Sequence, residues 1–413
     1  MRRGPPSGAS AERRGGYARA VLAALALAAA SITAASAAEA QPQGVDYMRD
    51  AFVFKRVLGW GTRAMWSPDG ERLAFTESDT LDSQAYELDL RSGSLRCLTC
   101  FLGANGRLSR LYYLPGGDFL VLAPEAFGRG NSPHAVSPGA DARGTRLFWM
   151  SAAPGSPPQD LGAVSFGDTA IGRHADGHGE VRVAWGEMRA GKMLLNLGVL
   201  AVEGGKARLD DRRVVYDSTQ PRGTAGATLA EAYSFVDGDR SVVFATLVVK
   251  NGVLDEEMYK VDIATGALAD ISRDPHQNET HAFPDDRYGL EESNRASDPN
   301  GRLRGVSGIR GDYVRSFAKR NGLRVPTERE LATYAPFGAL RGMGRPNDLY
   351  VTRMDGTGKP RRLTRFSQLG GDAHQSSASF DGRRIAFSLD ARDVGSLLPV
   401  EGLYVGEFQP VEK

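Results

Sequence analysis

The feature that most constrains the fold is a ten-residue pattern that occurs near both ends of the chain. "WSPDGERLAF" runs from Trp66 to Phe75, and "SFDGRRIAFS" runs from Ser379 to Ser388. In each copy an Asp-Gly turn leads into a short strand of alternating apolar residues, which is the pattern of a β-hairpin. Looser copies occupy residues 113–123, 176–187, 234–245 and 282–293. The sequence therefore predicts six such hairpins.

A second pattern of strand, glycine turn and strand follows each of these hairpins. Its copies occupy residues 86–99, 146–161, 197–209, 258–272, 349–364 and 402–408. Two hairpins form a four-stranded sheet, and four strands per repeat is typical of a propeller blade. One such sheet cannot bury both of its faces alone, so the copies must stack around a centre. We predict an all-β, six-bladed β-propeller over residues 41–413.

The last copy lacks a clear fourth strand after Phe408. A candidate strand, Ala51 to Val57, precedes the first copy instead. We expect this strand to complete the sixth blade and to close the ring. The 50 glycines of the chain agree with many tight turns, because turns need positive φ at some positions.

Residues 1–40 are predicted to be a signal peptide. Arginines precede the apolar segment 20–30, and an Ala-x-Ala site ends at Ala40, after which we expect cleavage. Eleven apolar residues are too few for a membrane span, so no transmembrane anchor is expected. The pair Arg13-Arg14 leaves both the general and the twin-arginine export routes open. The protein should be periplasmic or secreted.

Charge also limits the partners. Beyond the leader the chain has 46 basic and 48 acidic residues. A surface so balanced has no overall attraction for nucleic acid, and no nucleic-acid partner is expected. No metal or other cofactor is expected either, since no clear ligand motif is present.

A basic segment interrupts the fifth blade at about residues 301–345. It carries ten basic and three acidic residues, and Thr327 and Glu330 form a capping box that predicts a helix start. We expect a small helical insert whose side chains Arg315, Lys319 and Arg320 bind an anionic partner. A solvated lid with basic outer faces is the alternative interpretation.

Cys97 and Cys100 are the only cysteines in the chain. In an oxidising compartment the first interpretation is a structural disulfide. Residues three apart in a straight strand lie ~10 Å apart, too far for a bridge, so the bond requires a turn at Thr99-Cys100. Free thiols and a redox-active pair remain as alternatives.

Two histidines precede the inner hairpin turns of adjacent blades. Glu279 lies two residues before His281, and Asp372 lies two residues before His374. Innermost strands line the central channel of a propeller, so we predict that these four residues form a binding site at the channel mouth. No catalytic residue is assigned. Polar residues that merely line a wet channel are the alternative.

The repeat Ser-Pro-Asp-Gly-x-x-Leu-Ala-Phe at 67–75, followed by Tyr86 and by Leu98-Thr99, resembles the repeat of TolB-type β-propellers. Residues 278–297, 349–366 and 376–389 are similar to bacterial exported TolB-like proteins. The resemblance implies six blades and an exported location, without the α/β domain that precedes the propeller of TolB. The nine residues after Tyr404 leave no room for a hydrolase domain, and no Gly-x-Ser-x-Gly elbow occurs.

From these features we expect a non-enzymatic binding or scaffold protein with a protein or anionic glycan partner at the channel mouth. The alternative is a propeller lyase or hydrolase that acts on an anionic polysaccharide. The chain also resembles oligogalacturonate lyase in layout, an enzyme whose metal is held by His and Gln. Its clustered His-x-His pattern does not occur at His374-Gln375-Ser376.

Overall fold

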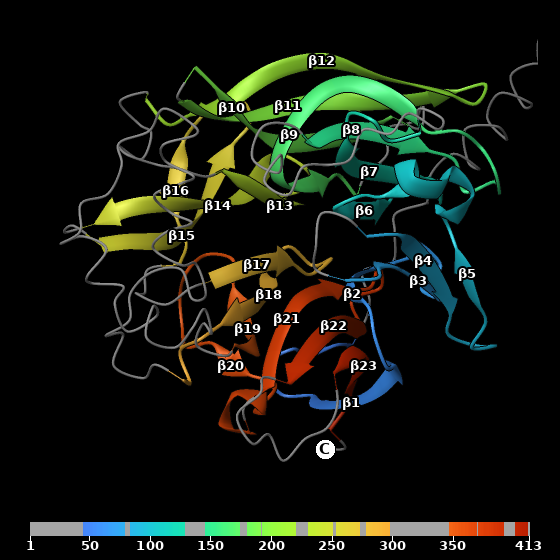
Figure 1. Cartoon of the computed structure of the whole chain (residues 1–413). Helices are drawn as coiled ribbons and strands as arrows, with labels where there is room; N and C mark the ends of the chain where they lie inside the picture. Colours follow the sequence, from blue (N-terminus) through green and yellow to red (C-terminus); the bar gives the residue numbers. More distant parts are fainter. Residues whose placement is uncertain are drawn as a thin grey trace, which may run out of the picture. The chain divides into compact units, whose positions relative to one another are not determined.

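The computed structural model describes residues 44–78, 83–128, 145–173, 180–190, 192–219, 230–250, 253–272, 278–297, 347–369, 371–391 and 401–411. Their strands pair as six antiparallel four-stranded sheets, the blades of a β-propeller (Figure 1). The fold class expected from the sequence is thus confirmed. The expected signal peptide, 1–40, and the expected insert, 301–345, lie outside the described residues.

Three of the blades are separate sheets whose strands follow chain order from the centre outward. Blade 1 contains β2 (Thr62–Trp66), β3 (Arg72–Thr76), β4 (Ala85–Asp89) and β5 (Leu95–Cys97). Blade 4 contains β13 (Glu231–Val236), β14 (Ser241–Lys250), β15 (Val253–Asp262) and β16 (Leu268–Asp270). Blade 5 contains β17 (Asn278–Ala282), β18 (Tyr288–Ser293), β19 (Asp348–Arg353) and β20 (Arg361–Arg362).

Blades 2 and 3 share one strand. Blade 2 contains β6 (Arg110–Tyr113), β7 (Phe119–Pro124) and β8 (Thr145–Met150), and blade 3 contains β10 (Val181–Arg189), β11 (Lys192–Glu203) and β12 (Lys206–Asp217). Between them β9 (Gln159–Ile171) pairs with β8 through residues 159–165 and with β10 through residues 166–171. One strand is therefore the outermost of blade 2 and the innermost of blade 3.

Blade 6 joins the two ends of the propeller chain. It contains β21 (Gly371–Ala378), β22 (Arg384–Ala391), β23 (Gly402–Gln409) and, outermost, β1 (Ala51–Leu58). The pairing of β1 with β23 runs from Ala51 opposite Gln409 to Leu58 opposite Leu403. Figure 1 shows the blue β1 beside the red β23. The expectation that residues 51–57 complete the last blade is confirmed.

The hydrophobic core lies between neighbouring blades. Phe75 of blade 1 packs with Ala386 and Leu403 of blade 6, and Phe235 of blade 4 packs with Leu195 of blade 3. The innermost strand β2 contacts both β6 and β21, so the first blade touches the second and the last. Each sheet thus buries its faces against the next sheet, as the repeat predicts.

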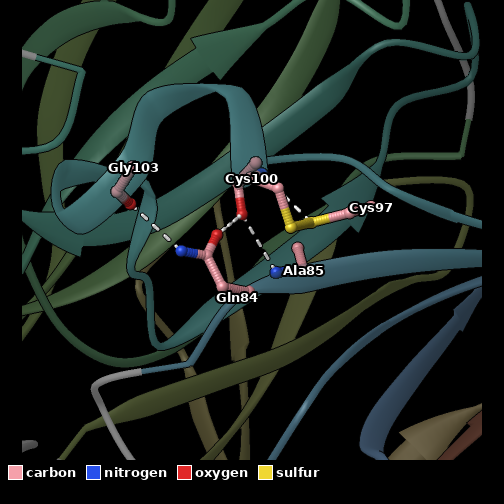
Figure 2. Close-up of a disulfide and its surroundings, with 6 residues drawn as sticks. Gln84, Ala85, Cys97, Cys100 and Gly103 are labelled. Atoms are coloured by element: carbon pink, nitrogen blue, oxygen red, sulfur yellow. Dashed lines mark hydrogen bonds between the residues drawn. A yellow bond between two sulfur atoms is a disulfide. The ribbon is translucent and has the colours of Figure 1, made fainter.

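A disulfide joins Cys97, at the end of β5, to Cys100, the first residue of the 3-10 helix η1 (Cys100–Gly106). The two Cα atoms are 5.7 Å apart, because the chain turns at Thr99. The hydroxyl of the fully buried Thr99 accepts a hydrogen bond from the Ala85 backbone N–H and bonds to the Gln84 side chain. Figure 2 shows this arrangement, which fixes the connection from blade 1 to blade 2.

Candidate functional site

The innermost strands of all six blades meet at one cavity. Its volume is about 100 Å³, and it lies where these strands end and enter the first hairpin turn of each blade. Every blade contributes to the cavity wall. Examples from blades 1 to 6, in order, are Met65, Tyr112, Thr169, Tyr233, His281 and Ser377. Because every blade contributes to its wall, this cavity is the candidate binding site.

A charged side chain recurs at one position of the innermost strands. When the inner hairpins are aligned on their turns, this position lies five residues before the one that Pro68 occupies in blade 1. In blades 1 to 5 the residues there are Arg63, Arg110, Asp168, Glu231 and Glu279. In blade 6 the position is taken by Gln375, which has positive φ, as Arg63 does. Charged groups from different blades are thereby directed to the same depth of the propeller.

Arg110 and Asp168 form the central ion pair of this set, between blades 2 and 3. The carboxylate of Asp168 also accepts a hydrogen bond from the Tyr112 hydroxyl (3.0 Å), which in turn accepts one from the Thr169 backbone N–H (3.2 Å). Burial together with the Asp168 carboxylate raises the pKa of Tyr112 well above its usual value. Both the hydroxyl and the guanidinium therefore keep their protons.

Glu231 faces this ion pair from blade 4. Its carboxylate accepts a hydrogen bond from the Tyr233 hydroxyl at 3.0 Å. It packs against Gly167, where any side chain would collide with it. Burial, followed by the negative charge of Asp168, raises the pKa of Glu231 to about 7. This carboxyl group can therefore exchange a proton near neutral pH.

His281 contributes a neutral imidazole to the cavity wall. Burial lowers its pKa to about 4, although Asp168 acts in the opposite direction. Its ring packs edge-on against Tyr233, with the ring centroids 4.9 Å apart. The adjacent charges of Arg110 and Arg173 further disfavour protonation.

His374 lies in a different cluster, between blades 5 and 6. Its Nε2 is 3.3 Å from a carboxylate oxygen of Asp390. Despite burial, the carboxylates of Asp390, Asp372 and Glu292 raise the pKa of His374 to about 9. Glu292 is held by the backbone N–H and hydroxyl of Ser376, at 2.6 and 2.9 Å. This imidazole is a cation at neutral pH.

The four predicted channel residues therefore divide between two clusters. His281 is the next-to-last residue of β17 and lines the cavity, whereas His374 lies four residues before the end of β21. Glu279 acts on the Arg110 charge, and Asp372 acts on His374. The predicted basic residues Arg315, Lys319 and Arg320 lie outside the described residues.

Sequence reasoning missed Arg110, Asp168, Glu231 and Tyr233. A signal was present, because aligning the inner hairpins by their turns places a charged residue at one position in five of the six copies. His281 and His374 stood out in the sequence because each precedes an inner hairpin turn and follows an acidic residue by two positions. The strand alignment carries more information than residue type in this fold.

Two further findings concern the described ranges of the chain. Within them, no group of three or more His, Cys, Asp or Glu side chains is arranged to hold a metal ion. No helix within them is long and apolar enough to cross a membrane.

The sequence matches no protein-family profile and no curated protein. Among solved structures, the protein is similar to a putative TolB from Agrobacterium tumefaciens, with 12% identity, a TM-score of 0.45, and coverage of 88% of this chain and 99% of that one. It is also similar to oligogalacturonate lyase from Vibrio parahaemolyticus, with 9% identity, a TM-score of 0.42, and coverage of 86% and 97%. TolB from Acinetobacter baumannii gives 12% identity, a TM-score of 0.39, and coverage of 76% and 56%.

Proposed function

We propose that this protein is an exported, non-enzymatic binding protein whose partner, a protein or peptide, inserts a side chain or chain end into the central cavity. The observation that carries the proposal is the convergence of all six innermost strands on that cavity. A concave site with a few convergent polar groups is the usual form of a binding site.

The composition of the cavity wall supports this function. Tyr112, Tyr233 and Phe235 supply aromatic surface, while Thr169 and Arg173 supply polar groups. Buried aromatic side chains and arginine are the residues that most often anchor protein interfaces. The hydroxyls of Tyr112 and Tyr233 are held by carboxylates, so their rings are fixed before a partner arrives.

Blocking the cavity tests the proposal. Peptides are selected from a random phage-displayed library on the purified protein. Their binding is then measured on Ala378→Cys, which places a thiol in the cavity wall, before and after labelling with a bulky maleimide. The native cysteines are already joined to each other, so the new thiol is the one labelled.

Labelling should abolish binding of the selected peptides. The control is Ala264→Cys, in the exposed turn after β15, where the same label should leave binding unchanged. Equal binding by the labelled and unlabelled Ala378→Cys protein would place the site elsewhere. The predicted basic insert adds a second test, since replacing Arg315, Lys319 and Arg320 with Ser should flatten the salt dependence of binding to an anionic partner.

One observation favours the enzymatic alternative, a lyase or hydrolase of anionic polysaccharide. Glu231 has a pKa of about 7 and lies beside the cavity with the Arg110 cation close by. A carboxyl group with such a pKa is suited to general acid–base catalysis. Turnover of oligouronides by the purified protein, lost in Glu231→Gln, would establish this alternative. Absence of turnover with pectic and alginate fragments would rule out that substrate class.

A further inference from the structure

The blade 3 side of the cavity holds two hydrogen-bond donors without a partner. They are the hydroxyl of Thr169 and the Nη1 nitrogen of Arg173, and both residues line the cavity. Thr169 is only 2% exposed. The other terminal nitrogen of Arg173 donates to the Ala282 carbonyl, whereas the nearest carboxylate oxygen, on Asp286, is 3.9 Å from Nη1. That distance is too long for a hydrogen bond.

Buried donors of this kind are unusual, because leaving one unpaired costs about 1–3 kcal/mol. Neighbouring hydroxyls on the wall are already engaged. Ser377 donates to the Ala64 carbonyl at 2.6 Å, and Ser379 donates to Asp381 at 2.5 Å. A guanidinium can donate but cannot accept. An acceptor on the occupant of the cavity would supply the hydrogen bonds that these two donors lack.

The charge of Arg173 favours a carboxylate over a neutral carbonyl, since charge-assisted hydrogen bonds are about twice as strong. Burial lowers the pKa of Arg173, and the aspartates near it act in the opposite direction. Two of those aspartates, Asp286 and Asp285, are engaged with other groups. Asp286 accepts from the Gly238 N–H at 3.0 Å, and Asp285 pairs with Arg287 at 3.3 Å.

The size of the cavity limits what can carry that carboxylate. A cavity of ~150 Å³ holds one benzene molecule, whereas this one measures about 100 Å³. A uronate ring with its substituents is larger than benzene and would take up more than this volume. A carboxylate on a stem of one or two methylenes does fit, and the Tyr233 and Phe235 rings can cover the stem.

We propose that Arg173 and Thr169 form a carboxylate subsite, which binds an acidic side chain or the C-terminal carboxylate of a peptide partner. This inference rests on the proposed function, because the carboxylate enters the same cavity. It adds the chemical class of the group that is recognised and the two residues that recognise it.

The test compares two probes of nearly identical shape, N-acetyl-glutamate amide and N-acetyl-glutamine amide. Binding of each to the full-length protein is measured by saturation-transfer NMR and calorimetry. The glutamate probe should bind at least tenfold more tightly. Thr169→Val should weaken the glutamate probe about fivefold, the equivalent of one hydrogen bond of about 1 kcal/mol. Arg173→Lys should weaken it about tenfold, because the planar fork is lost.

Thr169→Val is decisive because the hydroxyl has no partner in the folded protein, so the variant should fold with undiminished stability. Thr246→Val is the matched control, since Thr246 is also buried with an unpartnered hydroxyl but lies on β14, away from the cavity lining. It should leave probe binding unchanged.

Each contrary outcome has a separate meaning. Equal affinity for the two probes, or no effect of Thr169→Val, would overturn the carboxylate subsite. The proposed function would still stand if labelling of Ala378→Cys abolished binding of the library peptides. Binding of galacturonate with the same dependence on Thr169 would overturn the choice of a peptide. Unchanged binding of the library peptides after labelling of Ala378→Cys would overturn the proposed function itself.

Discussion

His281 and His374 occupy similar places in the sequence and opposite chemical states in the fold. Each lies on the innermost strand of its blade with an acidic residue two positions before it. Yet the pKa of His281 falls to about 4, and that of His374 rises to about 9. One imidazole is neutral at pH 7 and the other is charged.

The difference lies in the charges that surround each ring. His281 is buried and faces one carboxylate, Asp168, whose charge is opposed by Arg110 and Arg173; its ring packs against Tyr233. His374 faces the carboxylates of Asp390, Asp372 and Glu292, which outweigh its burial. Burial disfavours the charged form of both rings; it prevails at His281, where charges of both signs lie nearby, and is outweighed at His374, where the nearby charges are carboxylates. The charges around His281 come from blades 2 and 3, far away in the sequence, whereas two of the three carboxylates around His374, Asp372 and Asp390, belong to its own blade.

The largest expected effect comes from breaking the ion pair beside His281. Arg110→Met leaves Asp168, which is only 3% exposed, as an unpaired buried charge. This should lower the free energy of unfolding by about 3–5 kcal/mol. The pKa of His281 should rise at the same time, because a neighbouring cation is removed. Urea unfolding and NMR titration of the imidazole measure the two effects.

Arg189→Met is the matched control for that variant. Arg189 pairs with Glu187 at 2.6 Å, but its side chain is 61% exposed. An exposed pair contributes about 0–1 kcal/mol. Equal losses in the two variants would show that the Arg110 pair is not a buried one.

The next effect is the stability supplied by the charged His374. Its pKa is about 9 in the folded protein, above the ordinary value of 6.5. The stabilisation is therefore fully present below pH 6.5 and is lost as the pH rises through 9. It amounts to about 3 kcal/mol at most. His374→Gln should destabilise the protein at pH 6 and have little effect at pH 9.5. A cost that does not change between these values would contradict the charge assignment.

His281 should show the opposite pH dependence. Its folded pKa of about 4 lies below 6.5, so the folded state resists protonation. The wild-type protein should lose stability as the pH falls from 6.5 towards 4, by at most about 3 kcal/mol and by less if water in the cavity screens the charge. His281→Gln should reduce this acid-side loss and leave the stability near pH 8 almost unchanged. Thermal melts over the acid range distinguish the outcomes.

The sequence was sufficient for the architecture because propeller repeats are local. Each hairpin carries its own turn and alternating strand, and even the closing strand, residues 51–57, could be inferred from the missing partner of β23. The continuous strand β9 could not be inferred. The repeat requires only that the chain pass from the outer edge of blade 2 to the centre of blade 3, and either a loop or one long strand can do so.

The candidate site was only partly predictable. The turn that follows His281 in the sequence indicates an innermost strand, where the structure places this residue, but Arg110, Asp168 and Glu231 resemble ordinary strand residues when each blade is considered alone. Their pairing depends on which side chains meet across the channel, and this is a property of the closed ring. No single repeat contains that information.

The smallest effect concerns the hydroxyl that links the cavity wall to Glu231. Tyr233→Phe removes the 3.0 Å hydrogen bond to the carboxylate and should cost about 1 kcal/mol. The lost bond had favoured the ionised form, so the pKa of Glu231 should rise above about 7. A carboxyl group with a raised folded pKa stabilises the protein below its unfolded value, 4.5, and loses that contribution as the pH rises through the folded value. The cost of Tyr233→Phe should therefore be small at pH 5 and grow between pH 6 and pH 8. Chemical denaturation at these three pH values measures it, and a cost independent of pH would mean that Glu231 is not the group that titrates beside the cavity.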